Sequence, residues 1–289
     1  MSVGLIVLGA GVAAAGLAGI AYLALLWSFR VPRIVSATDP AAFGCRFEAV
    51  RVPTVRSRSL FGWYLPAAPG AAAVAVIHGW GAGADSLLPL GASLNRAGYA
   101  VLLVDARSHG ASDGDSFSSM PRFAEDLDSA LDWLKARPGP PPSRLVVLGH
   151  SVGGAAALLC ASRRDDLAAV VSLSAFDHPE RVMQVYFDRA HIPYRPVGWL
   201  LNRIVERVIG HRFDDIAPLA TIGRIRCPVL IGHGAEDELV PAAVAAAIAA
   251  RGDPARVEVH ILADSTHDRP ASFDLLGEII VAFLARKMA

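Results

Sequence analysis

Residues 45–289 alternate short runs of aliphatic and β-branched side chains with longer stretches of helical periodicity. Strands that are separated by helices build a mostly parallel sheet with helices on both faces. The strands are predicted at residues 47–52, 60–65, 72–78, 100–105, 144–149, 168–173, 228–232 and 257–262, and helices at 86–97, 121–136, 152–162, 242–250 and 271–287. The pattern therefore predicts an α/β fold with an eight-stranded sheet.

Residues 175–222 interrupt this alternation, because they contain no strand pattern. A structureless loop of such length is uncommon in a compact domain, so the segment is expected to form a helical cap over one end of the sheet. Leu201, Val205 and Val208 recur at helical spacing, with Arg203 and Arg207 on the other face. Such an amphipathic helix ordinarily packs on its own domain, and lining the substrate pocket or touching a membrane are the alternatives.

The first thirty residues differ from the rest of the chain in having a long uncharged run. Residues 3–27 carry no charged side chain, and 25 residues as a helix exceed the ~30 Å of bilayer hydrocarbon. A cleaved signal peptide or a buried core helix are the alternatives, but only Met1 and Ser2 precede the run, without a basic start. The sequence predicts a transmembrane anchor over residues 1–29, a linker over 30–44 and an α/β domain over 45–289.

The distribution of positive charge suggests how that anchor is oriented. Arg30 and Arg33 directly follow the apolar run, whereas no cation precedes it. Because cytoplasmic flanks of membrane spans are enriched in Lys and Arg, a single-pass protein with the domain of residues 45–289 in the cytoplasm is expected.

Overall composition excludes several classes of protein. The chain has 27 Lys and Arg against 27 Asp and Glu, and no basic run is interleaved with aromatic residues, so nothing marks a nucleic-acid surface. With 53% hydrophobic residues it is too apolar for a disordered protein. Its three cysteines are far apart and match neither a disulfide framework nor a zinc site. No metal or organic cofactor is predicted.

The most specific motif is Gly149-His150-Ser151-Val152-Gly153-Gly154, which lies between an apolar strand and a helical segment. In a G-x-S-x-G turn of this kind the serine adopts strained backbone angles, and the flanking glycines remove side chains that would collide there. Ser151 is therefore the predicted nucleophile. The helix that follows directs its N-terminus at Ser151, so the Val152 N–H is a predicted donor to an oxyanion.

A second oxyanion donor is expected from the loop after the third strand. There an apolar strand ends in His78-Gly79-Trp80-Gly81, and the glycine permits close approach of the backbone. The N–H of Trp80 is the predicted donor. An ordinary glycine turn is the alternative, and His78 is expected to bond the loop structurally.

From about residue 45 to its end, the chain resembles the α/β-hydrolase superfamily, in particular bacterial serine hydrolases near the serine aminopeptidase and lysophospholipase branches. Five motifs carry the resemblance in order: His78–Gly81, Asp105–Ser112, Gly149–Gly154, Gly234–Pro241 and His267. The resemblance implies an α/β-hydrolase fold with the chain order nucleophile, acid, histidine. It also implies that Asp105, Arg107, His109 and Ser112 brace a loop beside the site.

The acid and the base follow from this resemblance and from position. Among three adjacent carboxylates the family pattern selects Asp237, and Asp177 is the alternative acid. His267 follows the last strand and precedes the final helix, so it can reach Ser151, whereas His260 lies inside a strand. His109 and His150 match family positions of structural use. The predicted catalytic set is Ser151, Asp237 and His267.

These residues predict a serine hydrolase that cleaves a carboxylic ester or thioester through an acyl-enzyme. The expected substrate is a small ester or a lipid-like molecule with an apolar acyl chain, contacted by Trp199 and Leu201 if the cap lines the pocket. One alternative is a peptidase or amidase with the same three residues, and a catalytically idle membrane scaffold is another. Acidic cap residues that could hold a peptide amine are Asp177, Glu180, Asp188, Asp214 and Asp215.

Overall fold

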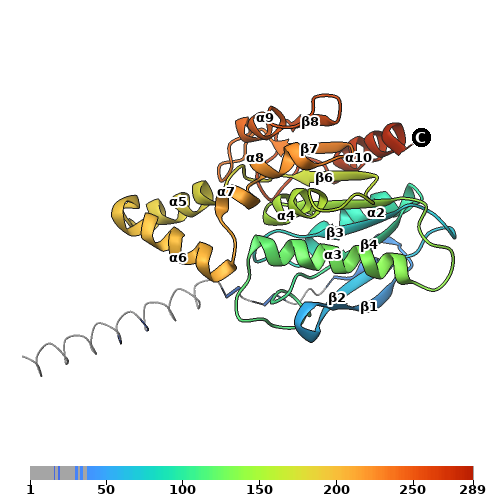
Figure 1. Cartoon of the computed structure of the whole chain (residues 1–289). Coiled ribbons are helices and arrows are strands. Elements are labelled where there is room, and N and C mark those ends of the chain that lie inside the picture. Colours follow the sequence, from blue (N-terminus) through green and yellow to red (C-terminus); the bar gives the residue numbers. More distant parts are fainter. Residues whose placement is uncertain (1–15, 17–18, 20–29, 32, 35–37, 289) are drawn as a thin grey trace, which may run out of the picture.

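The computed structural model describes residues 16, 19, 30–31, 33–34 and 38–288 (Figure 1). Within them, all eight predicted strands are present and form one sheet in the order β1-β2-β4-β3-β5-β6-β7-β8. β2 is antiparallel to both β1 and β4, and the remaining pairs are parallel. The strands are β1 (Glu48–Thr54), β2 (Arg58–Leu65), β3 (Ala73–Ile77), β4 (Ala100–Val104), β5 (Leu145–His150), β6 (Ala169–Leu173), β7 (Val229–Gly234) and β8 (Val257–Leu262).

Helices cover both faces of this sheet, as the sequence predicted (Figure 1). On one face, α3 (Met120–Ala136), α4 (Val152–Ala161) and α9 (Ala243–Ala249) contribute to a single apolar core with the strands. On the other, α2 (Leu88–Arg96) and α10 (Phe273–Met288) pack against each other and enclose a second core. The central strands are buried on both sides because nearly all of their side chains are apolar.

The cap consists of short helices, and no strand occurs among residues 175–222, in agreement with the prediction. α5 and α6 project from the sheet at one end of the molecule (Figure 1). The elements are α5 (Pro179–Arg189), the π-helical turn η4 (Tyr194–Gly198), α6 (Trp199–Ile209), α7 (Phe213–Ile216) and α8 (Pro218–Thr221). Gly198 allows η4 to approach α5, since a Cβ atom there would lie 2.9 Å from the Phe187 ring.

Short 3-10 turns complete the chain: η1 (Pro40–Phe43), η2 (Val55–Ser57), η3 (Ala84–Leu87) and η5 (Ile222–Arg224). The predicted anchor over residues 1–29 lies almost wholly outside the described residues. Among the helices that the structure does describe, none combines the length and the apolar character needed to cross a membrane.

Candidate active site

The predicted site residues follow the carboxyl ends of parallel strands that lie side by side. Ser151 follows β5, Asp237 follows β7 and His267 follows β8, while Trp80 comes after β3. In open α/β sheets this edge is where ligands bind. The topology thus brings together residues that are more than 100 positions apart in sequence.

Ser151 occupies a sharp turn between β5 and α4, with φ 57° and ψ −120°. A Cβ atom at Gly149 would lie 2.0 Å from the Gly153 carbonyl oxygen, and one at Gly153 would lie 2.4 Å from the His78 carbonyl oxygen. Only glycine fits at either position. The prediction that these glycines relieve crowding around Ser151 is therefore confirmed, and Val152 begins the helix directly after it.

His267 connects Ser151 to Asp237 through two hydrogen bonds. Its Nε2 atom lies 2.9 Å from Ser151 Oγ, and its Nδ1 atom lies 2.7 Å from Asp237 Oδ2. Because a carboxylate only accepts, Nδ1 carries the hydrogen and Nε2 is left as the acceptor for the serine hydroxyl. This tautomer is the one in which an imidazole can take the serine proton.

The carboxylate of Asp237 is fixed from several sides. Its Oδ1 atom accepts the backbone N–H groups of Leu239 and Val240, at 3.0 and 2.7 Å. Burial alone would raise the pKa of this carboxyl, but hydrogen bonds from His233, His267 and Val240 outweigh burial and hold the pKa well below its usual range. Asp237 is therefore ionised at neutral pH, and its second oxygen is aimed at His267.

The alternative acid Asp177 is placed differently. It is buried, and its carboxylate is paired with Arg181 one turn along α5. Its backbone carbonyl accepts the Leu219 N–H at 3.2 Å. Both of these partners lie within the cap, and it is Asp237 that contacts His267.

His78 has the structural environment that the sequence analysis assigned to it. Its Nδ1 donates to the Gly79 carbonyl at 2.6 Å, and its Nε2 accepts the Ala106 N–H at 3.0 Å. Full burial lowers the pKa of His78 to about 4. The neutral ring therefore links the end of β3 to the loop after β4 by hydrogen bonds.

The predicted bracing of that loop is also confirmed by its hydrogen bonds. The Asp105 carboxylate accepts the N–H groups of Ala84 and Ala111, both at 2.8 Å. Ser112 Oγ donates to the Asp105 carbonyl at 2.6 Å. Arg107 is buried against α3, where its Nε lies 2.6 Å from Asp126 Oδ1. Together these bonds hold the segment that supports Gly79 and Trp80.

A cavity of about 440 Å³ opens around Ser151 and His267. Trp80, which the sequence singled out for its N–H, lies on its wall, and Tyr186 is the residue of the described cap that reaches it. The rest of its wall is mainly apolar and includes Leu87, Leu173, Leu239, Leu262, Phe273 and Leu276. An uncharged, mostly apolar group therefore fits the space beside Ser151.

Two alternatives that the sequence left open for the cap do not match this cavity. Trp199 does not line this cavity but faces a separate hollow on α6 with Arg203 and Arg207, and Leu201 lines neither. Of the acidic cap residues proposed to hold a peptide amine, none lines the cavity. Asp268 is the carboxylate that lines it within the described part of the chain. The helix α6 packs against η4, and its Val205 belongs to the apolar core on the α3 face of the sheet, so α6 packs on its own domain as amphipathic helices ordinarily do.

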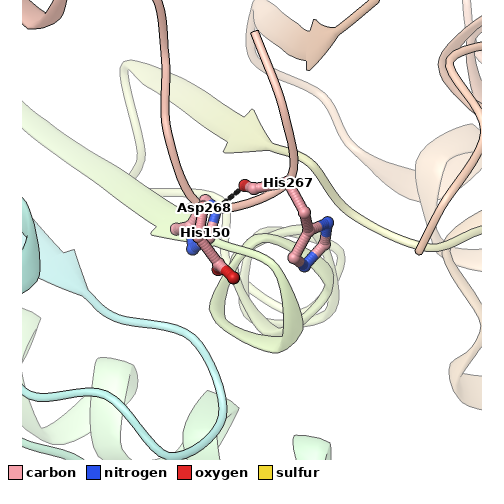
Figure 2. A group of neighbouring side chains, drawn as sticks. All are labelled: His150, His267 and Asp268. Carbon is pink, nitrogen blue, oxygen red and sulfur yellow. Dashed lines mark hydrogen bonds between the residues drawn. The ribbon is translucent and has the colours of Figure 1, made fainter. Parts of the chain in front are cut away.

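His150, His267 and Asp268 lie close together beside the cavity (Figure 2). Their possible ligand atoms are within 4.8 Å of one another, so the cluster invites comparison with a metal site. However, both ring nitrogens of His267 are already hydrogen-bonded, to Ser151 and to Asp237. In Figure 2 its ring points away from the other two side chains. The arrangement therefore fits proton transfer at His267 better than metal coordination.

Comparison with known proteins places the chain in a family. The family model described as serine aminopeptidase, S33, matches residues 68–218, which is more than half of the chain. An uncharacterised protein of Mycobacterium tuberculosis is 30% identical over 213 residues, covering 73% of this chain and 69% of that protein. This chain belongs to the serine aminopeptidase S33 family. Together with the fold, this membership makes it an α/β-hydrolase enzyme.

Solved structures resemble the whole domain of this S33-family hydrolase. The Pyrococcus furiosus esterase Pf2001 superposes with a TM-score of 0.75 at 22% identity, covering 90% of this chain and 98% of the esterase. Est1E from Butyrivibrio proteoclasticus, with ferulic acid bound, gives a TM-score of 0.66 at 20% identity, covering 83% and 99%. At this level of identity the likeness establishes the fold.

Sequence reasoning on the S33-family hydrolase missed the supporting part of His233, although it did expect a structural use for His150. His233, at the end of β7, is buried, and its Nε2 lies 2.8 Å from the Val240 carbonyl and 3.2 Å from Asp237 Oδ2. It thus holds the turn that presents Asp237. The available signal was a histidine at the carboxyl end of a central strand, the edge at which the site was already expected.

Proposed function

We propose that the enzyme is a serine hydrolase that cleaves a carboxylic ester or thioester through an acyl-enzyme. The observation that carries the proposal is the hydrogen-bonded chain from Ser151 Oγ through His267 to Asp237. An idle scaffold would not need a strained serine, an aligned imidazole and an ionised carboxylate in one line. Covalent labelling by a fluorophosphonate probe tests the proposal directly.

In the proposed reaction, Ser151 Oγ attacks the substrate carbonyl while its proton passes to His267 Nε2. The imidazolium that results is stabilised by Asp237 through Nδ1. The oxyanion is bound by the N–H groups of Val152 and Trp80. His267 then returns the proton to the leaving group, and water releases the acyl group by the reverse sequence of proton transfers.

An ester with an apolar acyl chain is favoured over a peptide by the surroundings of Ser151. The cavity wall is mainly apolar, and the acidic residues of the cap lie elsewhere. Two of the structural neighbours are described as esterases. The peptidase alternative retains two supporting features: Asp268 could hold a substrate amine beside the cavity, and the family is named for an aminopeptidase.

Activity should rise with acyl length on p-nitrophenyl esters until the cavity is filled. Each buried methylene stabilises the bound transition state by ~0.8 kcal/mol, so kcat/KM should increase several-fold per methylene. Phe273→Ala, which removes an apolar side chain of the wall, should reduce this gain. Trp199→Ala is the matched control, because Trp199 faces the other hollow.

Two other outcomes of this assay would contradict a preference for apolar acyl chains. A profile that peaks at acetate would indicate an acetyl-esterase. Preferential hydrolysis of aminoacyl amides, lost on Asp268→Asn, would move the enzyme to peptidase chemistry with the same three residues.

We also propose that the enzyme is attached to a membrane by residues 3–27, with the catalytic domain in the cytoplasm. Two features of the described chain support this. Val31, just after the apolar run, lies beside the site, since a Cβ atom at Gly81 would be 3.6 Å from it. The cap exposes Tyr186, Trp199 and Leu200 to solvent, and the last two share a hollow with the arginines of α6.

The full-length enzyme should therefore sediment with membranes and resist extraction by alkaline carbonate. A shortened chain that begins at Ala42 should remain in the supernatant and keep its esterase activity. Protease added to spheroplasts should leave the domain intact if it is cytoplasmic. A mature N-terminus beyond Trp27 would instead identify a cleaved signal and an enzyme outside the cytoplasm.

A further inference from the structure

His150 lies between Gly149 and Ser151 at the end of β5, and its side chain reaches the loop that carries His267. Its Nε2 atom is 2.8 Å from the carbonyl oxygen of His267, the bond drawn in Figure 2. A carbonyl oxygen only accepts hydrogen bonds, so Nε2 of His150 carries a hydrogen and donates it. The residue next to Ser151 is thus bonded to the backbone of the residue that contacts Ser151.

Apart from the His267 side chain, which bonds Ser151 and Asp237, three other bonds of this loop run within the loop or to the turn after β7. The Thr266 N–H donates to the Arg269 carbonyl at 3.0 Å, and Ser265 Oγ accepts the Ala271 N–H at 3.0 Å. The Ser265 carbonyl accepts the Glu236 N–H at 2.9 Å. None of these three reaches β5. The bond from His150 therefore ties the backbone of His267 to the strand that presents Ser151.

We infer that His150 is a positioning residue: its hydrogen bond to the His267 carbonyl holds the base at reacting distance from Ser151 Oγ. This inference rests on the proposed function. Asp237 orients the His267 imidazole from one end, while His150 fixes the backbone at the other. Two anchors define the ring position better than one, and small misplacements of reacting groups cost large factors in rate.

The surroundings of His150 suit this task. A Cβ atom at Gly79 would lie 3.1 Å from His150 Nδ1, so the Gly79 backbone packs against the ring from the side opposite to the bond. Burial lowers the pKa of His150 below its ordinary value, against the effect of the His267 bond, and keeps the ring neutral at neutral pH. A neutral donor adds no positive charge 5.4 Å from the ring of His267, which must itself become cationic.

The test compares His150→Gln, which retains an N–H donor, with His150→Phe, which retains a flat ring without one. On the fastest p-nitrophenyl ester, His150→Phe should lower kcat by about 10- to 100-fold with little change in KM. His150→Gln should recover most of that loss. His260→Phe on β8 is the matched control and should leave kcat unchanged, and Tm values show whether each variant is folded.

A second comparison separates positioning from a general loss of structure. In a His267→Ala background there is no base to position, so His150→Phe should not lower the residual rate further. An equal fall in both backgrounds, or full kcat in His150→Phe, would overturn the inference. If His150→Phe is unstable, His150→Asn, whose shorter amide does not reach the carbonyl, replaces it. Ser151→Ala is assayed alongside: turnover in that variant would reject the proposed function itself rather than the part of His150.

Discussion

Ser151→Ala should abolish ester hydrolysis and fluorophosphonate labelling while the domain remains folded. The substitution removes only the hydroxyl group, whose Oγ atom lies 2.9 Å from His267 Nε2. In the comparable protease case, removing the nucleophile or the base costs about 10⁶ in kcat. His267→Ala should therefore have a similar effect. Initial rates and probe labelling of the purified variants measure both losses.

Ser162→Ala is the matched control for this substitution. Ser162 ends α4 and donates to the Leu159 carbonyl at 2.7 Å, at the opposite end of the helix from Ser151. It should keep full activity. More than a few per cent of activity in Ser151→Ala would disprove the assignment of the nucleophile. Activity of His267→Ala that disappears only when His260 is also replaced would transfer the base to His260.

Asp237→Asn should reduce kcat by about 10⁴, as in the comparable protease case. Asparagine would keep the shape of the side chain, but its amide N–H₂ could face His267 Nδ1 and favour the tautomer with the hydrogen on Nε2. That tautomer cannot accept the serine proton. Steady-state kinetics on the same ester measure the effect, and circular dichroism confirms the fold.

Two carboxylates serve as controls for Asp237. Glu236→Gln changes its immediate neighbour in sequence and should have little effect on kcat. Asp177→Asn disrupts the pair with Arg181 and should lower stability more than kcat. A greater loss of kcat in Asp177→Asn than in Asp237→Asn would show that the acid has been assigned to the wrong strand end.

Much of the fold could be predicted because its signals are local. The strands around β3 and β5 are short apolar runs bounded by turns, and periodicity alone located them within a few residues. The crowding at Gly149 and Gly153 was likewise predictable, because a turn between an apolar strand and a helix leaves no room for a Cβ atom. Observed boundaries differ where capping decides them: α10 begins at Phe273, two residues after its predicted start.

The contacts that the site residues make were harder to predict from the sequence. Glu236, Asp237 and Glu238 are adjacent, and only a family resemblance distinguished them. In the structure Asp237 differs from its neighbours because the N–H groups of Leu239 and Val240 hold one oxygen and so direct the other at His267. The backbone of this turn, and not the type of residue, thus selects Asp237 from the three adjacent carboxylates.

The sequence by itself determined the order of strands and helices, the turn at Ser151 and the edge of the sheet where the site lies, since each depends on neighbours within a few residues. Tertiary structure alone decided that Trp199 faces away from the cavity and that His150 bonds the backbone of His267, 117 positions away. Such contacts depend on how whole elements pack against one another. Hydrophobic periodicity specifies which face of an element is buried, but not which residue it meets there.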